Sequence, residues 1–184
     1  MTFRLSIPSM VATATFERAM SALGSHPYQD PQNREYGHLP PLRRFIMSRR
    51  TAIDADLSQA QSVGWQYLIM DSLGLAVVDT SDDFNKTFTS VRRGAFASAY
   101  KAVLNQIDAD CGTSAEEFDA GMLEIPQLRT CAMLVRSIHK TFIYPVLLFG
   151  KLTPIRRFTQ DSFFELIAPV QPGNIREDSN TPKI

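Results

Sequence analysis

The chain has 184 residues, a length that fits one domain, since domains usually run to about 100–200 residues. Hydrophobic residues make up 44% and aromatic residues 10%, which provides for a packed core and excludes an intrinsically disordered protein. Nineteen basic and nineteen acidic side chains cancel. This balance argues against a protein that holds nucleic acid by net charge alone, and it leaves self-association unopposed by repulsion. We expect one domain over residues 1–168 and a polar, flexible tail over 169–184.

The cysteines and the N-terminal sequence bear on the compartment. Cys111 and Cys131 lack the CxxC spacing of a zinc site and are too few for a disulfide framework, which favours a reducing compartment. Glu17 and Arg18 interrupt the apolar region that a signal peptide would need. The longest apolar run, "TFIYPVLLFG", is shorter than the roughly 20 residues that cross a membrane. We therefore expect a soluble, intracellular protein.

A first helix is predicted after Ser9, a residue type that caps helices, and Gly24 marks its end. Residues 25–48 follow with four prolines, which disfavour regular helix and sheet and predict a long loop. The apolar residues that recur at helical spacing in the first helix are Ala12, Phe16, Ala19, Met20 and Leu23.

A second helix is predicted near Arg50, where Asp54 and Asp56 suit the positive end of the helix dipole. Residues 65–78 fit either a continuation of that helix or two short strands. Two glycines in and beside this stretch favour an interruption, so both alternatives stay open.

Two further helices complete the expected fold. "DTSDDF", residues 79–84, predicts the start of a third helix whose apolar stripe continues to Ile107. Residues 108–126 predict an acidic, mobile loop, and a fourth helix follows with apolar residues from Leu128 to Phe149. The sum is an all-α protein: an antiparallel four-helix bundle with long loops and room for a few short strands at one end.

No catalytic constellation is recognisable. None of the three histidines has a carboxylate or cysteine at metal-ligand spacing, and Cys131 lies on an apolar stripe as a buried structural thiol does. No phosphate-binding loop, dinucleotide-binding glycine pattern or nucleophile elbow occurs. We expect no enzyme, no catalytic residue, no cofactor and no metal; an enzyme with an unrecognised site ranks last among the hypotheses.

Arginine doublets recur along the chain and suit phosphate where they start a helix. Arg49 and Arg50 precede the second helix and Arg129 precedes the fourth, beside free backbone N–H groups. The alternative is that each doublet belongs to a solvated face or pairs with acids of this chain, which are equally numerous. For Arg156 and Arg157 we expect pairing with acids.

Several short stretches, taken in order, resemble the coat proteins of rod-shaped plant viruses of the tobamovirus and furovirus type. They are "SIPS" near the N-terminus, "ALGS" at the end of the first helix, "RTAIDADLS", "DTSDDF" and "FTQDSFFEL". The resemblance implies a structural capsid protein that assembles helically with many copies of itself around single-stranded genomic RNA. It implies location in the virion, and in the host cytoplasm during assembly, without membrane contact.

The resemblance also implies roles for particular residues. Phosphate contacts would come from Arg50, Arg129 and Arg49, with Asn105 and Gln106 where the family has arginines. Inter-subunit carboxylates would be Glu116, Glu117, Asp119 and Glu124, and the hydrophobic residues shared between subunits would be Phe158, Phe163 and Phe164. The rival hypothesis is a small helical regulatory or inhibitor protein that binds one protein partner.

Overall fold

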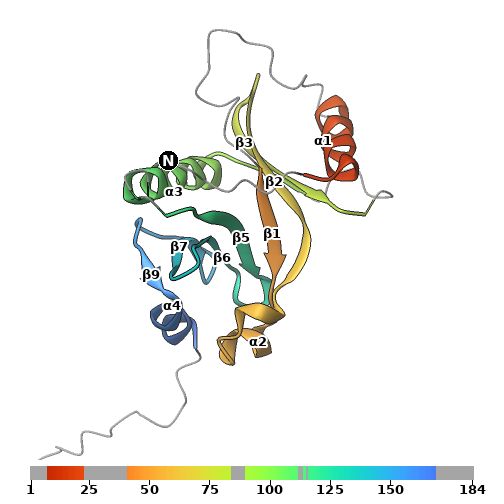
Figure 1. Cartoon of the computed structure of the whole chain (residues 1–184). Helices are drawn as coiled ribbons and strands as arrows, with labels where there is room; N and C mark the ends of the chain where they lie inside the picture. Colours follow the sequence, from red (N-terminus) through yellow and green to blue (C-terminus); the bar gives the residue numbers. More distant parts are fainter. Residues whose placement is uncertain (1–7, 23–40, 84–89, 112–113, 115, 169–184) are drawn as a thin grey trace, which may run out of the picture.

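A curled, nine-stranded β-sheet forms the centre of the computed structural model, which describes residues 8–22, 41–83, 90–111, 114 and 116–168 (Figure 1). The strands are β1 (Leu42–Ile46), β2 (Gln61–Asp71), β3 (Gly74–Ser81), β4 (Ser90–Arg93), β5 (Asp119–Ile125), β6 (Thr130–Arg136), β7 (Thr141–Leu148), β8 (Lys151–Leu152) and β9 (Phe158–Thr159). The α-helices are α1 (Met10–Ala22), α2 (Arg49–Ile53), α3 (Ala95–Cys111) and α4 (Gln160–Ile167), and the 3-10 helices are η1 (Leu57–Gln59) and η2 (Pro126–Leu128).

The sheet consists of two antiparallel halves joined by one parallel pair. Its strands lie in the order β4-β3-β2-β1-β5-β6-β7-β8, and β9 pairs with β7 beside β8. Along the described strands only β1 and β5 run parallel. Parallel neighbours need a long crossover, and the segment containing β2, β3, β4 and α3 makes that connection.

Helix α3 lies across one face of the sheet and covers the largest core cluster. The ring centre of Phe96, in its first turn, lies 4.2 Å from the guanidinium carbon of Arg92 on β4. Near its other end, Asp110 accepts a hydrogen bond of 2.8 Å from the hydroxyl of Tyr144 on β7. Because β4 and β7 lie near opposite ends of the strand order, the helix runs across the strands, and the sheet curls around it.

The opposite face of the sheet is covered by the three other α-helices. α2 and α4 contact each other and pack over β5, β6 and β7, where Phe163 and Ile167 are fully buried. α1 packs over β2 and β3, and its Phe16 stacks on Tyr67 with ring centres 4.0 Å apart. Side chains that alternate along one strand therefore enter two different cores, which makes the central strands apolar on both faces.

The expected all-α four-helix bundle is wrong, and the predicted fourth helix shows the reason. Residues 130–148 form the strands β6 and β7, and all of β6 except Arg136 is buried. A strand buried on both faces is a near-continuous apolar run, in which a helical spacing of apolar residues can always be found. The β-branched and aromatic side chains of "TCAMLVR" and "TFIYPVLL" favour strand, and this preference outweighs the apparent helical stripe.

The other predicted elements are confirmed or corrected as follows. The first helix is confirmed by α1, and residues 65–78 fall in β2 and β3, which decides that alternative for strands. The second helix shrinks to the five residues of α2. The third starts only at Ala95, because β4 precedes it.

The two predicted loops are shorter than expected. The loop predicted over 25–48 ends at β1, and the acidic loop predicted over 108–126 contains the end of α3 and all of β5. In both places charged residues hid a partly buried strand. The remainder of the proline loop and the tail over 169–184 lie outside the described residues.

Gly64 permits the close approach of β2 to β3. Its φ is +148°, and a Cβ atom there would lie 1.9 Å from the carbonyl oxygen of Thr80 on β3. Gly74, in the turn between the same strands, also has a positive φ, of +105°, but a Cβ atom there would have no other atom within 4 Å. A side chain at Gly64 would therefore meet both a steric clash and backbone strain, whereas a side chain at Gly74 would meet backbone strain alone.

Gly64→Ala is expected to lower the free energy of unfolding by about 3 kcal/mol or more, because backbone pairing must open to admit the methyl group. Gly74→Ala, the matched control, should cost only about 1 kcal/mol, from backbone strain alone. Urea denaturation followed by circular dichroism measures both. Equal losses in the two variants would contradict the close approach of β2 and β3.

Candidate functional site

A polar network on the α3 face of the sheet takes one side chain from each of five neighbouring strands. They are Arg44 of β1, Gln66 of β2, Asp79 of β3, Arg92 of β4 and Glu124 of β5. The carboxylate of Glu124 accepts hydrogen bonds from Arg44 at 2.9 Å, from Gln66 at 3.0 Å and from Arg92 at 3.0 Å. Arg92 also reaches Asp79 at 3.0 Å. The network therefore connects the two halves of the sheet.

The charges of this network are mutually compensated. Two guanidinium groups face two carboxylates, and the Asp79 side chain is only 4% exposed. Burial alone would lower the pKa of Arg92, but attraction to Asp79 and Glu124 outweighs it and raises that pKa. Since both oxygens of Glu124 accept hydrogen bonds, the network offers no free carboxylate for acid–base chemistry.

Burial keeps the phenol of Tyr100 and the thiols of Cys111 and Cys131 protonated. Burial raises the pKa of Cys131 to about 12, although nearby Arg92 works in the opposite direction. Burial likewise raises the pKa of Tyr100 and of Cys111. A nucleophile requires the opposite shift, so these groups behave as core side chains rather than as catalytic ones.

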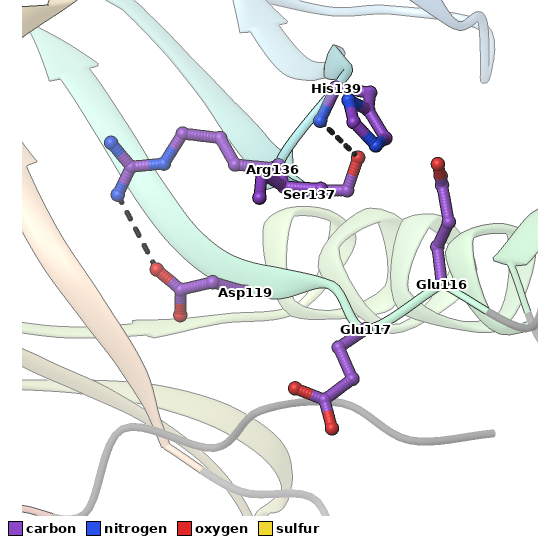
Figure 2. A pocket seen from close by; sticks show the side chains of 7 residues that line it. Glu116, Glu117, Asp119, Arg136, Ser137 and His139 are labelled. Atoms are coloured by element: carbon purple, nitrogen blue, oxygen red, sulfur yellow. Dashed lines mark hydrogen bonds and ion pairs between the residues drawn. The ribbon is translucent and has the colours of Figure 1, made fainter.

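A second feature is a pocket of about 670 Å³ between the start of β5 and the β6–β7 turn (Figure 2). Figure 2 shows Glu116 and Glu117 pointing to opposite sides of the chain, with Glu116 on the side of His139. The lining residues are Glu116, Glu117, Asp119, Arg136, Ser137, Ile138 and His139. Three of the four predicted inter-subunit carboxylates therefore come together here, whereas Glu124 lies in the polar network.

Two of the three acidic groups of this pocket have ion-pair partners. Arg136 lies 3.4 Å from Asp119, and the ammonium of Lys140 lies 3.9 Å from Glu116. Among the residues that the structure describes, no three His, Cys, Asp or Glu side chains are placed to hold a metal ion. The pocket is a surface hollow with ion pairs at its walls.

A third feature is a cationic surface formed by Arg49, Arg50, Arg129 and Lys151, all of which are exposed. Because β1 and β5 are parallel neighbours, their carboxyl ends lie side by side, and the chain continues from them into α2 and η2. These two elements are in contact, which brings Arg49 and Arg50 towards Arg129 across about eighty residues of sequence. Arg129 also packs against the β7–β8 turn, which precedes Lys151.

The cations of this surface differ from most of the other described arginines in lacking carboxylate partners. Within the described parts of the chain, none of the four forms an ion pair. The arginines that do are Arg43, Arg44, Arg92, Arg93, Arg136 and Arg157. Intramolecular pairing thus explains most of the doublets but not Arg49 and Arg50.

Other predicted site residues lie away from the cationic surface. Asn105 and Gln106 are exposed on α3, which lies apart from α2 (Figure 1), and the Gln106 amide donates to Asp110 at 2.7 Å. Phe163 and Phe164 are buried in this chain's own core and Phe158 is half-buried. Arg157 pairs with Asp110 at 3.9 Å, as expected, whereas Arg156 is exposed on the surface.

The polar network escaped the sequence analysis. Its one sequence signal is that charged residues such as Arg44, Arg92 and Glu124 stand inside β-branched and apolar runs, where a solvated charge is out of place. That signal is informative only once the strands are known, whereas the sequence predicted loops around Arg44 and Glu124 and a helix around Arg92.

Comparison with known proteins gives no match: no family model, no curated protein and no solved structure is significantly similar to this chain. Within the described residues, no helix combines the length and apolar character needed to cross a membrane. The function must therefore be argued from the three features above.

Cys131 is expected to be unreactive in the native protein, because burial and its raised pKa leave almost no thiolate at pH 8. A thiol-reactive dye should label it only when the chain unfolds, with a rate that follows denaturant concentration. Rapid labelling of Cys131 without denaturant would contradict its place in the core.

Glu124→Gln is expected to lower the free energy of unfolding by about 3 kcal/mol, because it leaves Arg44 and Arg92 without their shared countercharge in a poorly hydrated site. Asp119→Asn removes a half-exposed ion pair to Arg136 and should cost less than about 1 kcal/mol. Guanidinium denaturation would be too strongly screened, so urea is the denaturant to use. A loss for Glu124→Gln no larger than that for Asp119→Asn would show that the network does not join the sheet.

Proposed function

We propose that this protein binds single-stranded RNA through phosphate contacts at the cationic surface of Arg49, Arg50, Arg129 and Lys151. The observation that supports this most directly is the parallel pairing of β1 with β5, which gathers exposed cations from distant segments of the chain. Phosphate neutralisation by Lys and Arg supplies most of the affinity of proteins that bind nucleic acid without sequence preference.

The zero net charge of the chain is compatible with such a surface. Six arginines elsewhere pair with carboxylates of this chain, whereas the four cations of this surface form no such pair, so unpaired positive charge can gather here although the total is balanced. α4, which contacts α2, carries exposed Asp161 and Glu165. An RNA strand is therefore expected to pass over η2 and the β7–β8 turn rather than over α4.

The helical capsid and the one-partner regulator both stay predictions. Each was inferred for a helical bundle, and the curled sheet removes that support without deciding either. RNA binding is the part of the coat-protein hypothesis that keeps support from the fold, because three of its expected phosphate ligands, Arg49, Arg50 and Arg129, belong to one surface.

The double variant Arg50→Ala with Arg129→Ala is expected to weaken binding of a fluorescein-labelled oligouridylate, measured by anisotropy across a salt series. The slope of log affinity against log salt should fall by roughly 0.7 for each phosphate of the single strand that the variant no longer neutralises. Thermal unfolding should be almost unchanged for Arg50→Ala alone, whose side chain is exposed. Arg129→Ala also removes the contact of its guanidinium with Gly150, so circular dichroism must show that the double variant keeps the native fold.

The matched control is Arg136→Ala with Lys140→Ala, which removes two cations that already have carboxylate partners at the acidic pocket. This variant should keep the wild-type affinity and salt slope. An unchanged slope in the Arg50/Arg129 variant would refute the proposed site. Equal competition by polyglutamate would point instead to an acidic protein partner, which is the rival hypothesis.

A further inference from the structure

The turn between β7 and β8 holds an aromatic residue in a conformation that its side chain disfavours. Leu148 pairs with Lys151, so the loop consists of two residues, Phe149 and Gly150. Their φ angles are +51° and +81°, as in the type I′ turn, in which both central residues have positive φ. Asn, Asp and Gly are the usual first residues of that turn, whereas a bulky residue with positive φ is an outlier.

Neighbouring groups hold this turn in place. The backbone N–H of Phe149 donates to the hydroxyl of Thr130 at 3.2 Å, and that of Gly150 donates to the carbonyl of Arg129 at 2.8 Å. Arg129 itself has a φ of +49°, and its guanidinium lies so close over Gly150 that a Cβ there would meet it at 2.9 Å. Arg129 and Phe149, which both have a positive φ, are thus held close together by the contacts of Arg129 with Gly150.

The strain serves no packing purpose within the described chain. The Phe149 side chain is 51% exposed and belongs to none of the buried clusters, although its neighbour Leu148 packs against one. Strained residues that contribute little to the core are concentrated at binding and active sites. An exposed ring also supplies a flat surface on which any base can stack.

We infer that Phe149 is a base-stacking residue, which makes the cationic surface selective for unpaired nucleotides over duplex RNA. The inference rests on the proposed function and adds its selectivity. Arg129 takes a phosphate and Phe149, beside it in space, takes the adjoining base, so one nucleotide can satisfy both groups. A duplex keeps its bases stacked inside, so it offers the same phosphates but no free base to the ring.

The test compares protein variants and ligands in one set of anisotropy titrations. The ligands are a labelled oligouridylate, an abasic oligoribonucleotide of the same length and charge, and a blunt duplex. Phe149→Asn is expected to weaken oligouridylate binding by about 5- to 100-fold, the range of one base–aromatic stack. The same variant should bind the abasic strand and the duplex as the wild type does.

Conservative variants separate stacking from apolar contact and from folding. Phe149→Trp should keep or increase the affinity for oligouridylate, whereas Phe149→Leu, which is apolar without a ring, should lose it. Phe149→Asn should also raise the midpoint of thermal unfolding, because Asn-Gly is the preferred sequence of this turn. Weaker binding together with higher stability cannot come from a damaged fold.

Two results would overturn the inference and are distinguishable. If the wild type binds oligouridylate no better than the abasic strand, and Phe149→Asn binds equally well, the ring does not stack, while phosphate binding by the arginines stands. If the wild type binds none of the three ligands, both the proposed function and the stacking role are wrong.

Discussion

Convergence on the carboxylate of Glu124 is the interaction on which the rest of this structure depends. Arg44 and Gln66 come from the first half of the sheet, Arg92 from its edge, and Glu124 from the first strand of the second half. Removing such charges from water costs several kcal/mol each, and their pairing across the strands offsets much of that cost. A shifted register at β1 or β5 would bury the same charges unpaired. The network therefore selects the parallel joint of β1 and β5 over other pairings of equally apolar strands.

The parallel pairing of β1 with β5 determines where the candidate site lies. The backbone N–H of Met47 donates to the carbonyl of Glu124 at 2.9 Å, which continues the pairing of the two strands to the start of α2. Beyond this point β1 continues into α2 and β5 continues into η2, and each of these elements has an arginine in it or next to it. The paired strands beneath fix the position of α2 relative to η2. The charges that stay inside the sheet are neutralised in pairs, and those that emerge at its end are not.

Sequence reasoning identified the arginines of this surface but not the reason they meet. α1 was predictable because its apolar residues lie on one stripe of the helix and polar residues lie on the other sides. β6 and β7 were not, because burial on both faces removes the alternation that marks a strand, and helical spacing then fits by chance. The polar network was hidden for the same reason, since a charge is recognised as buried only after its neighbours are known to form strands. The positive φ of Phe149 had one local signal, the glycine that follows it.

The two short strands on the outer edge of β7 affect how the sheet can pair with strands of other molecules. β8 and β9 each pair over only two residues, and the stretch between them contains Pro154 and two arginines instead of a continuous ladder. The other outer strand, β4, is four residues long and ends in Arg92 and Arg93. Edge strands that are short, interrupted and charged offer an incoming strand few free backbone groups with which to pair. A sheet with so apolar an interior is thereby protected from uncontrolled fibre growth at both of its borders.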